Sequence, residues 1–181
     1  MVEIRTGRLI IRPPAERDRA RFVELFTDEA FTVFSDGVHD VGSANTRFDS
    51  MLLFADAVPY AKQPIMERSS GAVVGYTGVG SVLLAGVHRL EWGWRLVPEV
   101  RGQGYATEAT AALLSLADKV DDGEMLCLID VNNHPSRRVA DKVGFKWWRR
   151  IDWPDDPNDI TDALVRPIGA GGPPLIAPAS R

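Results

Sequence analysis

The segment from Val97 to Glu108 joins an extended stretch, a glycine-containing turn and the start of an amphipathic helix. It reads VPEVRGQGYATE, with glycines at positions 102 and 104. Glycine adopts backbone angles that other residues avoid, and it allows a ligand to approach the main chain. A helix that begins after such a turn presents N–H groups without intrahelical partners, and the positive end of its dipole attracts anions. The segment therefore predicts a pyrophosphate-binding site, to which Arg101 would add a positive charge.

Two common nucleotide-binding loops do not match this segment. A Walker loop ends in Gly-Lys followed by Ser or Thr, and a dinucleotide-binding loop requires a third glycine. Here position 107 is Thr, and no Lys follows the turn. The alternative without a ligand is a strand-to-helix turn in which glycine serves only to fit the backbone.

Three stretches of the chain resemble the GNAT family of acyltransferases. Residues 101–106, RGQGYA, resemble the Arg/Gln-x-x-Gly-x-Gly/Ala signature that holds the pyrophosphate of acetyl-coenzyme A in that family. Residues 133–145 resemble its Asn-x-x-Ser…Lys-x-Gly-Phe element, particularly in the branch that includes the ribosomal-protein N-terminal acetyltransferases. Residues 6–13 resemble the Thr-x-Arg-Leu-x-Leu-Arg-Pro opening of the same branch. The resemblance extends from about residue 5 to about residue 166.

This resemblance implies acetyl-coenzyme A as the co-substrate and a primary amine as the acceptor, either on a protein N-terminus or on a small molecule. By this resemblance, the loop amides would hold the phosphates and Asn133 would bind the pantetheine arm. The backbone N–H near Val97 would polarise the thioester carbonyl. The residues expected to bind the coenzyme are Leu96, Val97, Arg101, Gly102, Gln103, Gly104, Tyr105, Ala106, Thr107, Asn133, Ser136 and Arg137.

The loop alone leaves several alternatives open. A succinyl or other acyl-coenzyme A would use the same loop, so the identity of the acyl group is not determined. A non-catalytic coenzyme A sensor or a partner-binding module could also contain this loop. A homodimer is compatible with each of these interpretations.

The resemblance also implies an α+β fold, in which a mixed, mostly antiparallel sheet with splayed strands carries helices on both faces. Residues 31–42 lack a clear period and are expected to be irregular. Glycines at 75, 78 and 80 predict a bulge or the close approach of another backbone. Helical spacing, with Ser43 as an N-cap, predicts helices at 16–26, 43–58, 106–120 and 135–143. Apolar patterns predict strands at 9–12, 62–68, 72–84, 88–97, 125–131, 145–151 and 161–166.

Length and composition favour one domain. The 181 residues, of which 45% are hydrophobic, suffice for a single core. We expect the domain to span residues 1–167, and residues 168–181, rich in Gly, Pro and Ala, to form a disordered tail. The chain lacks the apolar stretches of a membrane span or a signal peptide, which indicates a cytoplasmic protein. A formal net charge of −4 argues against nucleic-acid binding.

Cysteine and histidine usage points away from metal and thiol chemistry. The single cysteine, Cys127, excludes an internal disulfide and a cysteine-cluster metal site. Its apolar neighbours predict a buried strand position, and no His or Asp spacing supports its use as a nucleophile. His39, His88 and His134 are too scattered to suggest a ligand set, so no metal is expected. We therefore expect the amine to attack the thioester directly.

Acyl transfer to an amine requires a neutral amine, stabilisation of the developing oxyanion and a proton for the leaving thiolate. An alkyl ammonium has a pKa near ~10, so a base or a water chain must remove its proton at neutral pH. Glu91 is the candidate base, because it lies on the strand before the turn and Gly93 leaves space beside it. A solvent-facing or salt-bridged carboxylate is the alternative. Glu108 is a weaker candidate, because the first turn of a helix attracts acids through its dipole alone.

The proton donor and the acceptor site are less directly indicated. Many family members use a tyrosine to protonate the thiolate, but Ala140 occupies that position here, so the resemblance points to Ser136. A capping serine is the alternative. A loop near the last strands would attract a cationic amine and stack against it, although a polar turn is the alternative. Its residues are Asp152, Trp153, Asp155, Asp156, Asp159 and Asp162.

Overall fold

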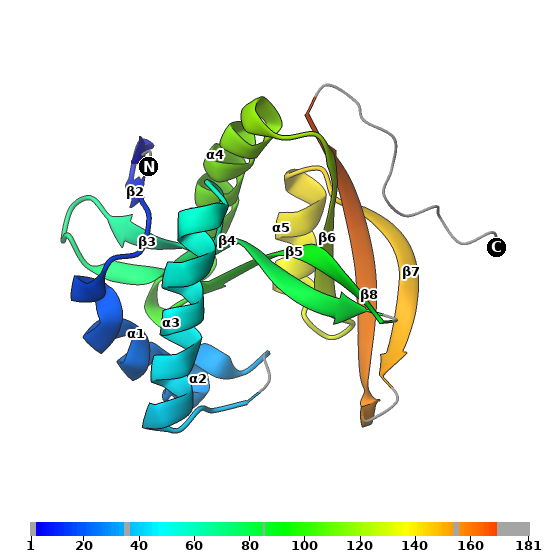
Figure 1. Cartoon of the computed structure of the whole chain (residues 1–181), viewed down its shortest axis with the longest axis horizontal. Coiled ribbons are helices and arrows are strands. Elements are labelled where there is room, and N and C mark those ends of the chain that lie inside the picture. Colours follow the sequence, from blue (N-terminus) through cyan, green and yellow to red (C-terminus); the bar gives the residue numbers. More distant parts are fainter. Residues whose placement is uncertain (1–2, 35–36, 85, 154–155, 170–181) are drawn as a thin grey trace.

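The computed structural model describes residues 3–34, 37–84, 86–153 and 156–169. Its strands are β1 (Ile4–Arg5), β2 (Leu9–Ile11), β3 (Gln63–Glu67), β4 (Val73–Leu84), β5 (Val87–Leu96), β6 (Gly123–Asp130), β7 (Lys146–Trp153) and β8 (Asp156–Ile168). They form one sheet in the order β1-β2-β3-β4-β5-β6-β8-β7 (Figure 1). Neighbouring strands are antiparallel except β5 and β6, which are parallel.

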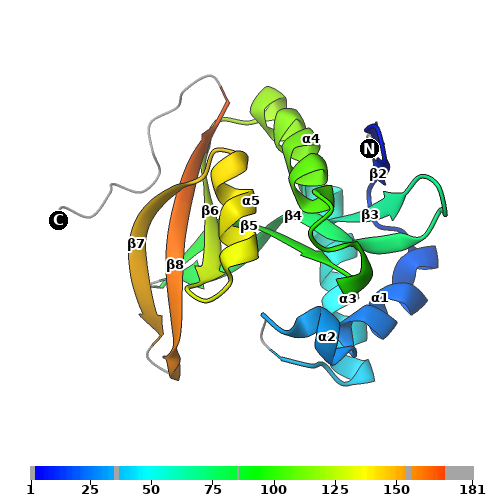
Figure 2. The ribbon, with the colours of Figure 1, turned by 180° about the vertical axis from the view of Figure 1, so that it is seen from behind.

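Helices cover both faces of this sheet. In Figure 1, α3 (Val41–Ala57) crosses in front of the sheet, with α1 (Arg19–Phe26) and α2 (Glu29–Thr32) beside it. The reverse view in Figure 2 brings α4 (Tyr105–Val120) and α5 (His134–Lys142) to the front. Short 3-10 helices, η1 (Glu16–Asp18) and η2 (Pro98–Val100), precede α1 and α4. The expected α+β architecture with a mixed, mostly antiparallel sheet is thus confirmed.

The central strands β5 and β6 separate at one end, as expected for the splayed strands that the resemblance implied. β5 pairs with β4 from Gly75↔Leu96 to Leu84↔Val87, whereas its register with β6 has the single pair Glu91↔Leu126. Beyond Glu91 the two strands run apart toward the loop that precedes α4 (Figure 2). The separation leaves backbone groups of β5 without a neighbouring strand on one side, and we call this space the β5–β6 gap.

Two glycines of β4 mark places where another backbone comes very close. A Cβ on Gly75 would lie 2.0 Å from the Arg95 carbonyl oxygen, and a Cβ on Gly78 would lie 2.3 Å from the Ala61 carbonyl oxygen. Both glycines have positive φ, at 157° and 134°. The predicted close approach is confirmed at these positions, whereas Gly80 faces the flexible Lys62 side chain.

Aromatic and hydroxyl side chains fasten the helices to the sheet. On one face, Tyr76 of β4 lies 6.2 to 6.3 Å, between ring centroids, from Phe22, Phe26 and Phe31. On the other face, the buried hydroxyls of Thr77 and Thr110 lie 2.9 Å apart, and the Trp92 indole N–H donates to Thr77 at 3.2 Å. These bonds fix α4 against β4 and β5, and so fix the loop at its N-terminus.

Several element boundaries differ from the sequence expectation for local reasons. α3 begins two residues before Ser43, because Asp40 is the N-cap and accepts a hydrogen bond from the Ser43 N–H at 2.9 Å. α2 forms at the start of the segment expected to be irregular, with Asp28 as its cap. β1 was not predicted, because a strand of two residues is too short to show an alternation of apolar and polar side chains.

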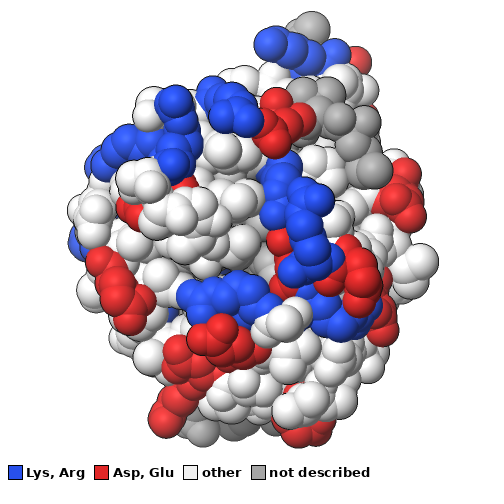
Figure 3. All heavy atoms as spheres, turned by 90° about the vertical axis from the view of Figure 1, so that its left-hand side faces the viewer, with Lys and Arg blue, Asp and Glu red and all other residues white. Residues whose placement is uncertain are grey.

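The C-terminal strand is longer than its sequence pattern indicated. β8 starts five residues before Thr161 and ends at Ile168, which is buried in the core. Residues 170–181 of the expected tail lie outside the described residues. On the face shown in Figure 3, positive and negative side chains form small neighbouring groups, and neither sign of charge dominates that face.

Candidate active site

The turn before α4 presents a row of backbone N–H groups. Gly102 has a φ of 77° and Gly104 a φ of 83°, both in the left-handed region that favours glycine. A Cβ on Gly102 would meet no atom within 4 Å, so the torsion angle, and not crowding, accounts for glycine there. The Glu108 N–H donates to the Gly104 carbonyl at 3.0 Å. The N–H groups of residues 105–107 come before this first helical hydrogen bond and have no partner among the described residues. Unpaired N–H groups at the start of a helix are suited to bind an anion.

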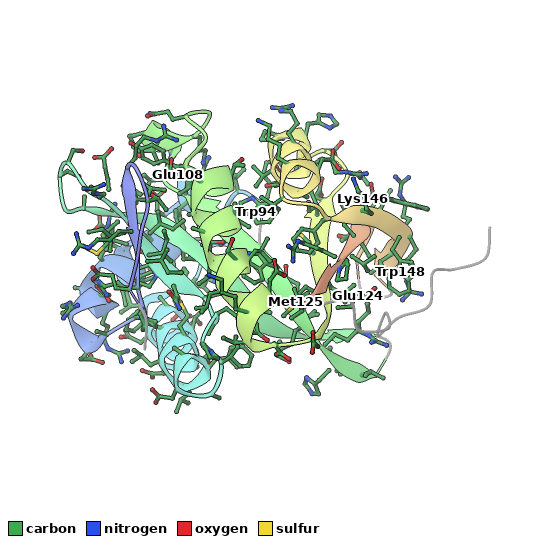
Figure 4. All side chains as sticks on the ribbon, turned by 90° about the horizontal axis from the view of Figure 1, so that it is seen from above. Trp94, Glu108, Glu124, Met125, Lys146 and Trp148 are labelled. Atoms are coloured by element: carbon green, nitrogen blue, oxygen red, sulfur yellow. The ribbon has the colours of Figure 1, made fainter. Side chains whose placement is uncertain are left out.

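One cavity of about 760 Å³ occupies the β5–β6 gap. Its walls come from the turn before α4, from β5 and β6, and from the start of α5. Trp94, which also lines it, lies between α4 and α5 in Figure 4. A cavity of this size suits a large organic ligand. The predicted site residues that line it are Glu91, Leu96, Arg101, Gly102, Gly104, Tyr105, Ala106, Thr107, Asn133 and Ser136.

The resemblance places the polarising amide near Val97, but the N–H of Val97 itself already has a partner. Its N–H donates to the Val74 carbonyl at 2.9 Å. Hydrogen-bonding direction alternates along an antiparallel strand, so the N–H and carbonyl of Leu96 face away from β4 and toward the gap. The Leu96 carbonyl indeed accepts a bond from outside the sheet, from Arg101 Nε at 3.0 Å. Of the two residues expected at this point, Leu96 is therefore the one with a backbone N–H that faces the gap.

Two other predicted coenzyme ligands have different partners. The Gln103 side chain donates to the Glu99 carbonyl at 3.0 Å, within its own turn. Arg137 lies 3.4 Å from Asp141 and 3.3 Å from Asp162, and neither Gln103 nor Arg137 lines the cavity. The basic side chains of α5 that do line it are Arg138 and Lys142. Sequence reasoning placed both in a basic segment without assigning them to the site.

Arg101 connects the turn to two other parts of the fold. Besides its bond to Leu96, its Nη2 donates to the Ala30 carbonyl in α2 at 2.7 Å. Burial lowers the pKa of Arg101, and the neighbouring Arg95 lowers it further. The guanidinium remains a fixed positive charge beside the turn, held by carbonyl groups.

Glu91 lies in the wall of the cavity where β5 and β6 begin to separate. Its side chain is 19% exposed, and its Oε2 lies 3.8 Å from Lys62 Nζ. A Cβ on Gly93 would lie 3.6 Å from Glu91 Oε1, which is an ordinary contact distance, so a small side chain would also fit beside the carboxylate. Lys62 was missed from the sequence, because it is far from Glu91 along the chain and precedes β3. The carboxylate is thus partly removed from water and is paired with Lys62, so the structure is compatible with both the base and the salt-bridged carboxylate that the sequence left open.

Glu108 has a structural role instead of a catalytic one. It accepts hydrogen bonds from Thr6 Oγ1 at 2.6 Å, from the Arg8 N–H at 3.0 Å and from Arg8 Nε at 2.8 Å. Burial raises its pKa, but these donors outweigh burial and the net pKa is lowered. Figure 4 shows Glu108 beside the N-terminal strands, on the other side of α4 from Trp94. It therefore connects the N-terminal motif to α4.

Asn133 and Ser136 form the N-terminal cap of α5. Asn133 Oδ1 accepts a bond from the Ser136 N–H at 3.1 Å, which fixes Ser136 at the edge of the cavity. The Ser136 hydroxyl has no hydrogen bond to a described residue. Ala140, at the family's tyrosine position, is fully buried. Within α5, the hydroxyl side chain that lines the cavity is therefore that of Ser136.

Cys127 lines the same cavity but is chemically unsuited to attack. Its thiol is buried, and burial, reinforced by Glu91, raises its pKa well above the ordinary value. A thiol kept protonated is a poor nucleophile. The arrangement therefore favours direct transfer over a cysteine-bound acyl group.

The acidic loop proposed as an acceptor site is largely outside the described part of the chain. Asp155 lies outside the described residues, as do the side chains of Asp152, Trp153, Asp156 and Asp159. Asp162 is described, and its carboxylate is already bound by Arg150 at 3.2 Å, Arg137 and the Trp147 indole. Within the described residues, no group of three or more His, Cys, Asp or Glu side chains could hold a metal. Nor does a described helix have both the length and the apolar character needed to cross a membrane.

Residues 8–146 match the family model described as acetyltransferase (GNAT) domain. Similar solved structures include a protein assigned to that family from Bordetella pertussis, with a TM-score of 0.80 and 20% identity, covering 92% of this chain and 99% of that one. The ribosomal-protein-S5-alanine acetyltransferase from Vibrio fischeri has a TM-score of 0.78 and 11% identity, covering 96% and 100%. The ribosomal L7/L12 alpha-N-protein acetyltransferase RimL, in complex with coenzyme A, has a TM-score of 0.76 and 17% identity, covering 92% and 98%.

At these identities the solved structures show a common fold, whereas the family model covers most of the chain. The chain is a transferase of the GNAT acetyltransferase family, whose co-substrate is acetyl-coenzyme A.

Proposed function

We propose that this protein transfers an acetyl group from acetyl-coenzyme A to a primary amine by direct attack of the amine on the thioester. One observation carries the proposal: a single cavity connects the turn before α4 with Glu91 on β5 and Ser136 on α5. The groups suited to bind phosphate, to accept a proton and to donate one therefore line the same space.

The chain's own groups divide the binding of the coenzyme between them. The free amides of residues 105–107 and the Arg101 guanidinium would hold the diphosphate. Arg138 and Lys142 on α5 add positive charge to the opposite wall. The bound coenzyme supplies the activated acyl carbon of its thioester. The Leu96 N–H, which faces the gap, would stabilise negative charge on the carbonyl oxygen.

Two side chains would move the protons. Glu91 accepts a proton from the incoming ammonium, which creates the neutral amine needed for attack. The Ser136 hydroxyl donates a proton to the thiolate as it leaves, and it regains a proton from the nitrogen of the tetrahedral intermediate, which becomes the amide nitrogen. The cap from Asn133 holds Ser136 in place for this step. The buried Cys127 takes no part, so the amine itself forms the new bond to carbon while the carbon–sulfur bond breaks.

The acceptor is a primary amine on a small molecule or at a protein N-terminus. Two of the similar structures are named for ribosomal proteins, which supports including N-terminal peptides among the acceptors tested. Succinyl-coenzyme A belongs in the same panel, because the turn binds the part that all acyl-coenzyme A molecules share.

The test follows thiol release from acetyl-coenzyme A with primary amines and short peptides. Wild-type protein should release thiol only when an acceptor is present. Glu91→Gln keeps the side-chain size but removes the base, so we expect kcat to fall about 100-fold or more while the Kd for acetyl-coenzyme A is unchanged. The deficit should shrink as the pH rises toward the amine's own pKa near ~10, because neutral amine then forms without help.

Glu99→Gln is the matched control, since Glu99 is an exposed carboxylate in η2, next to the same turn. It should retain wild-type kcat. Binding of acetyl-coenzyme A with no thiol release for any acceptor would refute the transfer activity. Wild-type rates in Glu91→Gln at neutral pH would refute only the role of Glu91 and assign proton removal to water.

A further inference from the structure

A second cavity meets the β5–β6 gap beside Glu91. It measures about 730 Å³ and lies between α3 and β4. Arg47, Lys62 and Tyr76 line both cavities. Under the proposed function the coenzyme extends from the turn before α4 into the gap. The second cavity therefore gives the acceptor a separate route to Glu91.

The side chains at this junction are mainly cationic. Lys62 Nζ lies 5.8 Å from the centre of the Tyr76 ring, and Arg95 Cζ lies 5.8 Å from the same ring. Burial raises the pKa of Tyr76, but the charges of Arg95, Lys62 and Arg47 outweigh burial and lower it. Glu91 opposes them as the one carboxylate among the described groups that act on Tyr76. The junction therefore has a positive potential despite the negative net charge of the chain.

Arg95 lies beside this junction, where it lines the β5–β6 gap but not the second cavity. Its guanidinium lies over the rings of Phe31 and Tyr76, with Cζ 5.7 and 5.8 Å from their centres. Its Nη1 is buried with no hydrogen-bond partner, and it forms no ion pair with a described residue. Lys62, in contrast, is paired with Glu91. An unpartnered buried guanidinium N–H is costly, and an oxyanion from a ligand would satisfy it.

We propose that the acceptor is a small amine that carries an oxyanion within a few bonds of its nitrogen, and that Arg95 binds this oxyanion. The inference rests on the proposed transfer function and specifies its substrate class. The second cavity, of about 730 Å³, has the size of a small-molecule site, and the oxyanion of an acceptor held there would reach Arg95 through the junction with the β5–β6 gap. The positive potential has a second effect, because it disfavours the ammonium form of the amine and so favours the neutral form that attacks.

The experiment compares acceptors that differ by one charge. Each α-amino acid is paired with its carboxamide, and kcat/KM is expressed per concentration of unprotonated amine, because the carboxamide also lowers the amine pKa. Wild-type protein should prefer the acid by about 10- to 100-fold, the range expected for a charge-assisted hydrogen bond. 1-Aminoalkylphosphonates form a third arm, which distinguishes a carboxylate site from a phosphoryl site.

Arg95→Met should bring the acid-to-amide ratio to about 1 while leaving the KM for acetyl-coenzyme A within about twofold of wild type. Arg95→Lys keeps a positive charge and should retain part of the preference. Arg89→Met is the matched control, because Arg89 is on the same strand and face but lines neither cavity. Thermal unfolding of each variant verifies that it is folded.

Three results would overturn the inference. Equal use of acids and amides by the wild type would refute it while the transfer function stands. An unchanged acid-to-amide ratio in folded Arg95→Met, with a raised KM for acetyl-coenzyme A, would assign Arg95 to the coenzyme instead. Failure of every amine to release thiol would refute the proposed function together with the inference.

Discussion

Arg8 connects the N-terminal strands to the turn before α4. Its Nη1 donates to the Gln103 carbonyl at 2.9 Å, and its guanidinium lies 4.5 Å from the centre of the Tyr105 ring. Together with the bonds to Glu108, these contacts hold the turn from the side opposite the cavity. The sequence showed Arg8 as part of a motif but not its partners, which are nearly a hundred residues away in the chain.

Arg8→Met should weaken acetyl-coenzyme A binding by about 10-fold, because a charge-assisted hydrogen bond and an ion pair that position the turn are lost. Calorimetry should show this change in the Kd for acetyl-coenzyme A. The kcat of Arg8→Met at saturating coenzyme should stay close to the wild-type value. Arg5→Met serves as control, since Arg5 pairs with Glu3 on the exposed surface. Equal Kd values for wild type and Arg8→Met would show that the turn keeps its shape unaided.

The passage from β2 to the first helical turn depends on one buried ion pair. Arg12 donates two hydrogen bonds of 2.7 Å to Asp18, and the Ala15 N–H adds a third at 2.9 Å. The Arg12 and Asp18 side chains are only 10% and 4% exposed. Burial raises the pKa of Asp18, but the bonds from Arg12 and Ala15 outweigh it and the net pKa is lowered. The strand expected at residues 9–12 is confirmed as β2, and Pro13 and Pro14 follow it, whereas the ion pair that shapes the turn was not predicted.

Asp18→Asn should reduce the free energy of unfolding at pH 7 by about 3 kcal/mol, because it leaves Arg12 buried without its counter-ion. A lowered pKa in the folded state means that the pair stabilises above the unfolded pKa of about 3.9, and that this contribution is lost as the pH falls through the folded pKa. Urea titrations should therefore show that the free energies of unfolding of Asp18→Asn and wild type differ less at pH 3 than at pH 7. A difference equal at both pH values would contradict this account.

For the whole molecule, the parts of the site that are local in sequence were the parts that could be predicted. The turn at 102–107 and the candidate base Glu91 belong to one strand–turn–helix segment, whose periodicity and glycines are visible without a structure. Arg95, Lys62 and Tyr76 meet only after β3, β4 and β5 pair, so no spacing rule could bring them together. The free amide likewise depends on the register of β4 and β5, which is why Leu96 and not Val97 supplies it.

The central claim is that the turn before α4 binds the coenzyme through its backbone amides, and calorimetric titration with acetyl-coenzyme A tests it most directly. Gly104→Val introduces a β-branched residue at a φ of 83°, which should disturb the turn and weaken binding at least about 10-fold. Gly71→Val places the same strain at a φ of 71° in the β3–β4 hairpin, outside both cavities, and should bind like the wild type. Wild-type affinity in a folded Gly104→Val protein would contradict the claim.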